Sequence, residues 1–595
     1  MSSQNLPPAL CLTRPVRLGI DVGTYSTGYG WAILKPDSAP GTRREISLKR
    51  SWPGAPPDAV KTLTRLLLNT DGSVVAFGYD AQRKGESRNA GGKNSGLRLV
   101  EAIKVRLGRA PDPALHNTIT LGQYTDLPER SLALFLTQVY QHAVADIARA
   151  GYNEEQIQVC ITVPAVFTDH QKQLVRHAAY AAGISREKGA LILALEPEAA
   201  AQYALTSGVR IGSGIDAVPV DLAAPGTRFI VVDCGGGTID ITAYRCDGDG
   251  ITEIGKVGGG WCGGAYLNAA FENLVLKPHF GGDNMYEKLR ERFPAAVRSM
   301  RDAWEQVKRD ITVDHNESLY LQIPADIAVN LTPRVKKRLK DRQDGQATQL
   351  IVTAAEVHAV FAAVIPQVVD LVDQQLAVVV EEFGALETPE NVLLVGGFAE
   401  SAYLRRSLTD HFAGRAKILT PPDPSIAVVA GAVHFACEPE TRARRVRFSY
   451  GIEIAKDFDE NAGHPEAYKK VVDGKAMCFN VFRPHARAGD IIPTTHEATA
   501  RYWPTSSKQD RIQFDVYRST DRNPEYVTDP TCHYIGSLRR LEPGHRLGQK
   551  PPWRRGAFPL WGNRDRRVGL CHPNRPAGAR RVRLRQTRIS RRVIP

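Results

Sequence analysis

A glycine turn between two apolar stretches is the part of this sequence best suited to binding an anion. Residues 228–240 read RFIVVDCGGGTID, which is typical of a strand, a tight turn and a returning strand. Three residues of the turn have no side chain to keep an anion away from the backbone N–H groups: Gly235, Gly236 and Gly237. Thr238 adds a hydroxyl, and Asp233 stands where it could hold a hydrated cation against that anion. The segment predicts a phosphate-binding hairpin, and an ordinary turn is the alternative for one copy alone.

Two further segments repeat the pattern of an apolar strand that ends in glycine. Residues 16–34 read VRLGIDVGTYSTGYGWAIL, with Asp21 at the strand end, followed by a turn that contains Gly23, Thr24 and Tyr25. Residues 391–401 read NVLLVGGFAES, in which the flat backbone of two glycines could support a base or a ribose: Gly396 and Gly397. Two Asp-Gly-Thr hairpins in one chain predict two similar half-domains whose turns face each other across one nucleotide.

These segments resemble those of the actin-like ATPase superfamily. The chain is similar to the 70-kDa heat-shock (Hsp70) chaperone family, in particular to its heat shock 70 kDa protein 12 branch. The resemblance is strong over residues 16–436 and faint over 443–536. It implies an α/β fold, a two-lobed actin-like (ribonuclease H-like) domain that binds ATP or ADP with Mg²⁺ between its lobes. A glutamate before a proline at 196–197 and a Glu-x-x-Lys-Arg pattern at 305–309 favour the chaperones over sugar kinases of the same fold.

The resemblance also implies roles for individual residues around the phosphates. The segment EAIKVRLGR at 101–109 offers Lys104 to the phosphates, where a solvated surface lysine is the alternative. Magnesium, held largely through water, would be positioned by three carboxylates: Asp21, Asp233 and Glu196. Asp233 or Asp240 would orient the attacking water. Catalysis would then depend mainly on positioning and electrostatics.

Other motifs match the family's contacts to the nucleotide with two departures. Gly263 and Gly264 match a phosphate-side loop, although Ala265 replaces its usual acidic residue. At i, i+3 and i+4 of one predicted helix face lie three residues that match the grip on adenine and ribose: Glu305, Lys308 and Arg309. Asp423 matches a nucleotide-facing position. Glu400 stands where the chaperones place an arginine over adenine, so the base must be held differently or more weakly.

Composition is that of a globular protein, with 43% hydrophobic and 24% charged residues among 595. The longest apolar runs are shorter than the eighteen residues that a membrane span needs, and the first fifteen residues do not form a secretory signal. Nine cysteines occur without a CxxC pair, which favours reduced thiols over disulfides or zinc.

The basic charge of the chain is concentrated near its end. Residues 537–595 carry sixteen Arg and one Lys against two acidic residues, so the preceding 536 residues carry −2 of the total of +13. This composition predicts a disordered tail, which could bind nucleic acid or an anionic membrane or could be an altered gene ending. Nucleic acid is not expected to bind elsewhere on the chain.

Hydrophobic periodicity predicts how these sites are supported. Residues 157–163 suit a buried strand, followed by a helix capped at Thr168 or Asp169, and residues 355–384 suit one long helix. Alternation with period two predicts strands within 443–536. We therefore expect four parts: a disordered lead (1–15), a nucleotide-binding domain (16–436), a partial β-rich substrate-binding-like module (443–536) and the basic tail (537–595).

The functional prediction is an ATP-binding, ATP-hydrolysing Hsp70-like protein, a divergent chaperone with reduced peptide binding. The alternatives are a nucleotide-dependent binding module that does not hydrolyse ATP and, third, a sugar-kinase-like phosphotransferase. The resemblance implies unfolded client proteins and co-chaperones as partners, and a location in the cytoplasm, with the nucleus as the alternative.

Overall fold

The structure is a computed structural model that describes residues 13–541 and 556–559 with short interruptions. The interruptions are residues 36–44, 58, 90–95, 105–106, 108–127, 188, 212–217, 249, 344, 346, 386–387, 501, 503–504 and 507–510. The chain divides into two compact units, of which the first comprises residues 1–251 and 257–440 and the second comprises residues 252–256 and 441–595. Most of the predicted lead, most of the tail beyond residue 541 and parts of segment 101–109 lie outside the described residues.

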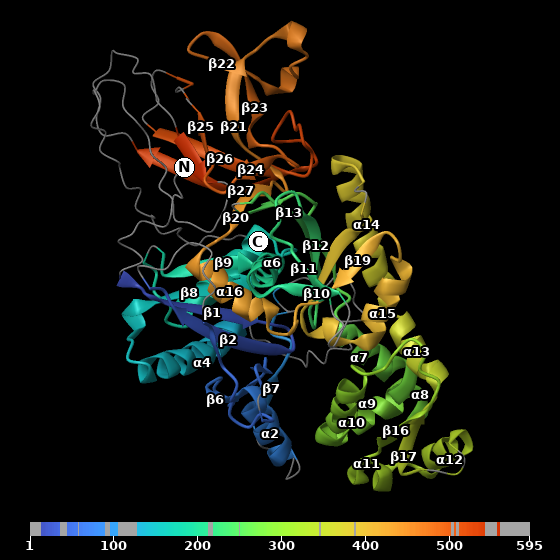
Figure 1. Ribbon diagram of the computed structural model, residues 1–595. Coiled ribbons are helices and arrows are strands. Elements are labelled where there is room, and N and C mark those ends of the chain that lie inside the picture. The colour runs from blue at the N-terminus through green and yellow to red at the C-terminus, as the bar shows by residue number, and fades with distance from the viewer. Residues whose placement is uncertain are drawn as a thin grey trace. The chain divides into compact units, whose positions relative to one another are not determined.

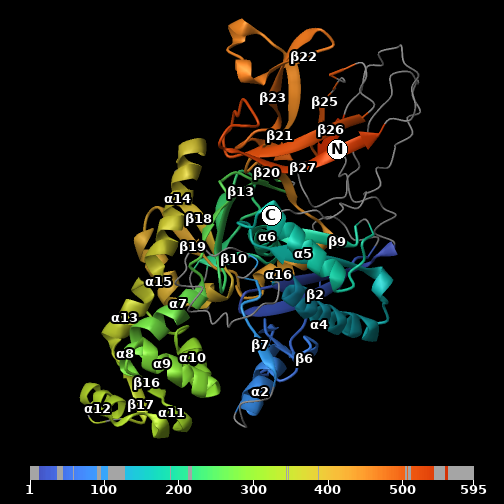
Figure 2. The same ribbon diagram turned by 180° about the vertical axis from the view of Figure 1, so that it is seen from behind.

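The first sheet of the first unit contains the N-terminal hairpin. Strands β1 (Val16–Val22) and β2 (Ser26–Ile33) pair antiparallel, as the sequence predicted. Strand β8 (Ile157–Val163) lies parallel beside β1, and β9 (Leu191–Leu195) lies parallel beside β8. Helices α4 (Pro128–Arg149) and α5 (Asp169–Ala181) pack against each other and contribute to the apolar core beside this sheet (Figure 2). We call this sheet and its helices the first lobe.

The second sheet repeats that arrangement with the central hairpin. Strands β12 (Arg228–Cys234) and β13 (Ile239–Cys246) pair antiparallel, which confirms the predicted hairpin. Strand β18 (Glu390–Val395) lies parallel beside β12, and β19 (Ala416–Leu419) lies parallel beside β18. We call this sheet and its helices the second lobe. Each of the two sheets thus contains an antiparallel hairpin and two parallel strands, and each hairpin contains one of the two Asp-Gly-Thr motifs.

Two buried helices join the lobes at a close crossing. Helix α6 (Glu196–Ser207) follows β9, and α16 (Ala427–Cys437) packs against both α6 and β1 (Figure 1). A Cβ atom at Gly431 would lie 1.8 Å from the carbonyl oxygen of Ala199, so only glycine permits this approach. All eleven residues of α16 are buried, which explains its apolar sequence.

The remaining elements of the first unit are helices and short strands, of which α9 to α12, β16 and β17 lie together at one end (Figure 1). Its helices are α2 (Gly78–Asn89), α4 (Pro128–Arg149), α5 (Asp169–Ala181), α7 (Gly264–Phe271), α8 (Lys277–His279), α9 (Asp283–Arg292), α10 (Pro294–Val307), α11 (Ala325–Asn330), α12 (Pro333–Arg342), α13 (Ala354–Ala362), α14 (Ile365–Phe383) and α15 (Ala402–His411). Its short strands are β3 (Ser47–Leu48), β4 (Thr62–Leu63), β5 (Leu66–Leu68), β6 (Val74–Phe77), β7 (Arg98–Val100), β10 (Val209–Ile211), β11 (Val218–Val220), β15 (Gly258–Gly260), β16 (Leu319–Gln322) and β17 (Gln349–Val352). Strand β14 (Ile251–Glu253) lies at the boundary of the two units.

Two helix predictions meet different outcomes. The N-cap at Thr168 is confirmed, because its hydroxyl accepts the amide of Gln171 at 3.3 Å. The single helix predicted for 355–384 is wrong, since α13 ends at Ala362 and α14 begins at Ile365. Pro366, at the start of α14, lacks the N–H that a continuous helix would need there.

By length and composition, the helical stretch Ala354–Phe383 could cross a membrane. Its apolar side chains at Val357, Phe361, Val368 and Val372 are buried in the first unit, as a core helix requires.

The second unit consists mainly of strands. One sheet has the order β22–β23–β21–β26–β27, while β20 pairs with β24 and β25 pairs with β28. Their bounds are β20 (Thr441–Arg445), β21 (Ser449–Asp457), β22 (Lys469–Val472), β23 (Lys475–Ala486), β24 (Ile491–Pro493), β25 (Glu497–Ala500), β26 (Arg511–Ser519), β27 (Cys532–Leu541) and β28 (Gly556–Pro559). Strand β27 continues past Gly536, the residue at which the predicted module ends.

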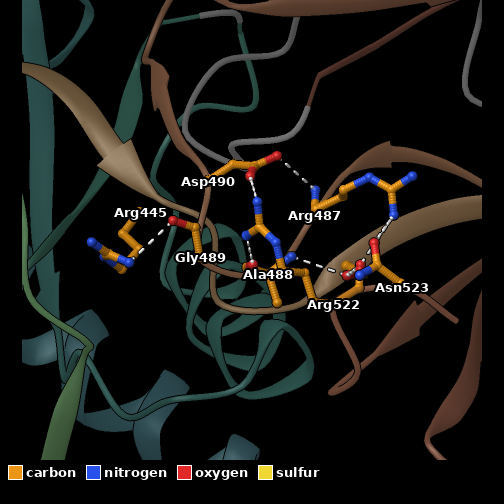
Figure 3. Close-up of polar contacts among 8 residues, drawn as sticks. Arg445, Arg487, Ala488, Gly489, Asp490, Arg522 and Asn523 are labelled. Carbon is orange, nitrogen blue, oxygen red and sulfur yellow. Dashed lines mark hydrogen bonds and ion pairs between the residues drawn. The ribbon is translucent and has the colours of Figure 1, made fainter. Parts of the chain in front are cut away.

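Arginine side chains form hydrogen bonds that hold the turn between β23 and β24 in place (Figure 3). Arg522 donates to the carbonyl of Ala488 and, at 2.7 Å, to the carboxylate of Asp490. Arg445 donates to the carbonyl of Gly489 at 3.1 Å. Arg487, within the turn, donates to Asn523. The turn is thus held to the segment that follows β26 by side-chain contacts.

Candidate functional site

The turns of the two hairpins face each other in the first unit. A Cβ atom at Gly237 would lie 2.5 Å from the hydroxyl oxygen of Thr24, and one at Gly236 would lie 3.2 Å from Cβ of Tyr25. A side chain at Gly237 would therefore separate the turns. The amide of Gly235 donates to the carbonyl of Thr238 at 3.0 Å and closes the central turn.

A third glycine loop is bound to the central turn through its backbone. The amide of Gly264 donates to the carbonyl of Gly235 at 3.0 Å, and the amide of Ala265 donates to that of Gly236 at 2.7 Å. A Cβ atom at Gly263 would lie 2.6 Å from the Gly235 carbonyl oxygen, so glycine is required for this packing. These bonds fix the start of α7 beside the turn.

The loops enclose a cavity of about 300 Å³. It is lined by most of the predicted site residues: Asp21, Gly23, Thr24, Tyr25, Lys104, Glu196, Asp233, Gly235, Gly236, Gly237, Thr238, Gly264, Glu305, Lys308, Arg309, Gly396 and Gly397. Three predicted residues do not line it: Asp240, Gly263 and Asp423. Asp423 instead accepts the hydroxyl of Ser425, which does line the cavity, at 2.8 Å.

Asp21 lies at the end of β1 and is held by two donors. Lys61 donates to one carboxylate oxygen at 2.7 Å, and the Thr162 hydroxyl donates to the other at 2.9 Å. Burial opposes ionisation of this carboxyl, but the charges of Lys61 and Lys104 outweigh it and hold the pKa of Asp21 below its ordinary value. Asp21 is therefore an ionised group that already has a cationic partner.

Lys104 reaches the cavity as predicted, but it contacts a carboxylate there. Its ammonium forms a buried ion pair with Glu196, the first residue of α6. Burial acts against the charge, yet Glu196 and Asp21 keep the pKa of Lys104 above its ordinary value. The surface-lysine alternative is wrong, since Lys104 is only 8% exposed.

Asp233 and Asp240 face each other across the central hairpin. They are directly opposite in the register of β12 and β13, where like charges repel. Burial, and then the charges of Asp240 and Asp21, raise the pKa of Asp233 to about 7. One oxygen of Asp240 accepts the amide of Val166 at 3.0 Å, and the other is buried and has no hydrogen-bond partner among the described residues.

The second-lobe end of the cavity is formed by a closed group of polar side chains. Lys308 donates to Glu305 at 2.7 Å and to Asn268 at 2.8 Å, and Asn268 donates to Glu305 at 2.7 Å. Burial outweighs the charge of Glu305 and lowers the pKa of Lys308. Arg309 donates to Glu400 at 3.2 Å.

One geometric prediction at this end is wrong. Helix α10 ends at Val307, so Arg309 lies in the turn beyond it and does not share a helix face with Glu305. The residues that follow are β-branched at Ile311, Thr312 and Val313, which disfavours further helix.

The structure also adds lining residues that sequence reasoning missed: Lys61, Tyr79, Asn268 and Ser425. Lys61 lies outside any glycine motif, so its spacing gave no signal. Asn268 lies four residues after Gly264 on α7, and this helical spacing could have indicated it.

The repeated sheet topology and the cavity lined by glycine turns define the class of protein. The chain has the two-lobed actin-like ATPase fold, and the cavity between its two matching hairpins is of the kind that holds a nucleotide in this fold. Residues 114–438, more than half of the chain, match the profile of the family described as Hsp70 protein, and the chain belongs to the Hsp70 family. Membership makes it a nucleotide-binding protein of the ATP/ADP class with Hsp70 character.

Individual relatives agree with the predicted branch. The chain is 26% identical to human heat shock 70 kDa protein 12B, over 91% of this chain and 86% of that protein. It is 24% identical to human heat shock 70 kDa protein 12A, over 88% of this chain and 84% of that protein. The chaperone protein DnaK 3 of Synechococcus is 26% identical over 56% of this chain and 45% of its own length. The resemblance to the heat shock 70 kDa protein 12 branch is confirmed.

Proposed function

We propose that the first unit binds ATP with magnesium and hydrolyses it to ADP and phosphate. The observation that carries the proposal is the convergence of four glycine loops and three carboxylates on one cavity: Asp21, Glu196 and Asp233. Glycine loops leave backbone amides open to phosphate oxygens, and the carboxylates suit the cation that accompanies a triphosphate.

The charges beside the glycine turns fit a divalent cation. Four carboxyl groups, those of Asp21, Glu196, Asp233 and Asp240, interact there with two ammonium groups, those of Lys61 and Lys104. With every group ionised, two negative charges lack a partner. No three acidic, imidazole or thiol groups in the described part of the chain converge closely enough to hold a metal directly, so water must complete the coordination. When bound, magnesium would neutralise charge on the outer phosphates.

The chain's own groups would then position the reactants. The turn residues Gly23 to Tyr25 and Gly235 to Thr238 would hold the phosphate chain between the lobes. Asp233 or Asp240 would accept a hydrogen bond from the attacking water and orient it. Lys104 would offset charge on the transferred phosphoryl group, which requires it to leave or share Glu196.

The second unit supports a narrower proposal about clients. Its strands would serve as a partial substrate-binding module, and the complete chain would act as a divergent chaperone with reduced peptide binding. Unfolded clients and co-chaperones are the partners this role requires, and the cytoplasm is the proposed location, with the nucleus as the alternative. All seven cysteines in the described ranges are free thiols, in agreement with a reducing compartment.

A nucleotide-dependent binding module without hydrolysis is the second candidate. It is favoured by the ion pairs Lys61–Asp21 and Lys104–Glu196, which engage these groups with one another. Single-turnover hydrolysis of Mg-ATP by the full chain, with and without unfolded peptide, separates the two candidates. Release of phosphate in step with ATP loss supports the ATPase, whereas ATP that binds and stays intact supports the module.

A further inference from the structure

Helix α12 concentrates positive charge on a chain whose body is slightly acidic. Six of its ten residues are basic and one is acidic, whereas residues 1–536 as a whole carry a net charge of −2. The helix begins at a cap formed by Thr332 and packs into the first unit through the buried side chains of Val335 and Leu339. Figure 1 shows it at one end of that unit. The positive charge is therefore a local feature of this helix.

Four basic side chains lie along one exposed stripe of α12. Arg334, Arg338 and Arg342 follow one another at intervals of four residues, which places them on the same helix face, and Lys337 lies beside Arg338. All four are exposed, and within the described part of the chain their side chains have no ion pair or hydrogen bond. Like charges at this spacing repel, and a cation in the first helical turn opposes the helix dipole. The stripe thus costs helix stability and suits an external anionic group.

The stripe borders a hollow of about 630 Å³, which we call the α12 hollow. Its lining residues are Pro278, Gly282, Arg334, Lys337, Arg338, Asp341 and Arg342. A Cβ atom at Gly281 would lie 3.1 Å from the side chain of Val335, whereas one at Gly282 would meet nothing within 4 Å. The turn after α8 therefore packs closely on α12 at one glycine and leaves open space at the next. Among the described residues, the α12 hollow and the nucleotide-type cavity share no lining residue.

The spacing of the arginines suits an extended acidic peptide. Residues four apart on an α-helix rise by about 6 Å, and alternate side chains on one face of an extended chain are about 6.6 Å apart. Carboxylates at every second residue of such a peptide can therefore each meet one guanidinium, which binds a carboxylate through two hydrogen bonds. The peptide backbone also offers N–H donors to Asp341, whereas the phosphodiester backbone of DNA offers none. A lipid surface is flat and does not enter a hollow.

We propose that the α12 hollow is a docking site for an extended acidic segment of a partner protein. The recognition groups are the guanidinium groups of Arg334, Arg338 and Arg342, with Lys337 adding charge beside them. The inference is independent of the proposed nucleotide binding, because the two places have no lining residue in common among those described. Since the basic side chains are exposed, the affinity should fall as the salt concentration rises.

The test is fluorescence anisotropy of the full chain with a labelled peptide in which glutamate alternates with threonine. Arg334→Gln/Arg338→Gln removes two cations from the α12 hollow. Lys336→Gln/Lys340→Gln is the matched control, because it removes the same charge from the same helix and neither lysine lines the hollow. The first variant should bind the peptide about fivefold more weakly than the wild type, since two exposed ion pairs are lost, and the control should differ from the wild type by less than about twofold. Equal weakening in both variants would overturn the proposal.

Amide hydrogen exchange of the wild type shows where the peptide binds, and this measurement needs no variant. It is required because the arginine-rich tail beyond residue 541 can also attract an acidic peptide. Addition of the glutamate peptide should slow exchange within residues 333–342, and the same peptide with glutamine in place of glutamate should not. Unchanged exchange in this helix would overturn the proposal. Displacement of the peptide from the helix by a lower concentration of single-stranded DNA would overturn it in favour of a nucleic-acid site.

Discussion

At the scale of residues, the carboxylates beside the glycine turns are suited to a charged ligand more than to stability. Asp233 and Asp240 are buried opposite each other, and Asp21 adds a third negative charge nearby. Without a ligand, the protein must either protonate one of these carboxylates or be destabilised by their mutual repulsion. Burial, together with the repulsion from Asp240 and Asp21, raises the pKa of Asp233 to about 7.

Asp233→Asn should stabilise the ligand-free protein in a pH-dependent way while it abolishes most hydrolysis. A carboxyl whose pKa rises on folding, from 3.8 to about 7, costs stability increasingly as pH rises through that range, and the full cost applies above it. The free energy of unfolding of the variant should exceed that of the wild type by on the order of 2 kcal/mol at pH 8, and the difference should shrink towards pH 4. Thermal denaturation across this pH range, without nucleotide, measures it. A variant less stable at every pH would mean that Asp233 has a structural role.

Substitutions of Lys104 and Glu196 can separate folding from chemistry. Lys104→Met leaves a buried carboxylate without its partner, which should cost about 3 kcal/mol. Adding Glu196→Gln removes that charge and should restore most of the stability, but not hydrolysis. Urea denaturation and single-turnover assays of the single and double variants provide the comparison. Hydrolysis at the wild-type rate in the double variant would remove both residues from the mechanism.

The sequence indicated residues of the cavity lining where glycine and aspartate spacing carried the information. Asp21 and Asp233 end equivalent strands, so both could be predicted from local patterns. Lys61 could not be, because its contact with Asp21 joins residues forty apart through the tertiary fold. The pairing of Arg309 with Glu400 was equally invisible, since no local period relates the two positions.

At the scale of elements, the crossing of α6 and α16 depends on one residue without a side chain. Gly431→Ala would place a methyl group against the backbone of Ala199, and overpacking of this kind should cost about 3 kcal/mol or more. Gly85→Ala is the control. Gly85 lies inside helix α2, and the atom nearest to its added Cβ, on Leu67, would be 3.6 Å away, which is an ordinary contact. That change should stabilise the protein by roughly 0.5–1 kcal/mol. Differential scanning calorimetry of both variants tests whether the crossing requires glycine at position 431. Similar melting temperatures of the two variants would contradict that requirement.

The arginine contacts in the second unit permit a test of that unit by itself. Arg522→Ala removes the donors to Ala488 and Asp490 (Figure 3). Because Arg522 is more than half exposed, we expect a loss of only about 1 kcal/mol. Lys475→Ala, which breaks the exposed pair with Asp457 in the same unit, should cost less than about 0.5 kcal/mol. Amide hydrogen exchange of residues 487–490 should become faster in Arg522→Ala only. Equal exchange rates in Arg522→Ala and Lys475→Ala would argue against the inference that Arg522 holds this turn in place.

Elements were predictable where the period was long or the turn chemistry was distinctive. Both hairpins and the Thr168 cap follow from local sequence. The break between α13 and α14 was missed because apolar residues continue through it, although Pro366 carried the signal. The end of α10 at Val307 was missed because the match to a family motif overrode the β-branched residues that follow.

At the scale of the whole molecule, the parts assigned to nucleotide chemistry all belong to the first unit. Among the described residues, no residue that lines the cavity lies beyond Val428, and the two units are separately compact. Chaperone action further requires that the peptide site and the nucleotide site bias one shared element. Residues 441–445, which directly follow the first unit, form strand β20 and pair with β24 of the second unit.

We therefore expect basal ATP affinity and hydrolysis to be independent of the C-terminal tail. Truncation after Leu541 keeps β27 whole, whereas truncation at Gly536 would cut through that strand. Both quantities should remain within about twofold of the full chain, because distant sites without shared partners usually do not couple. The same assays with unfolded peptide should show weak or no stimulation, since residues 441–445, where the first unit ends and the second continues, are already paired in strand β20. A large loss of hydrolysis on truncation, or stimulation of the full chain by several-fold, would instead establish the C-terminal region as a working partner of the ATPase.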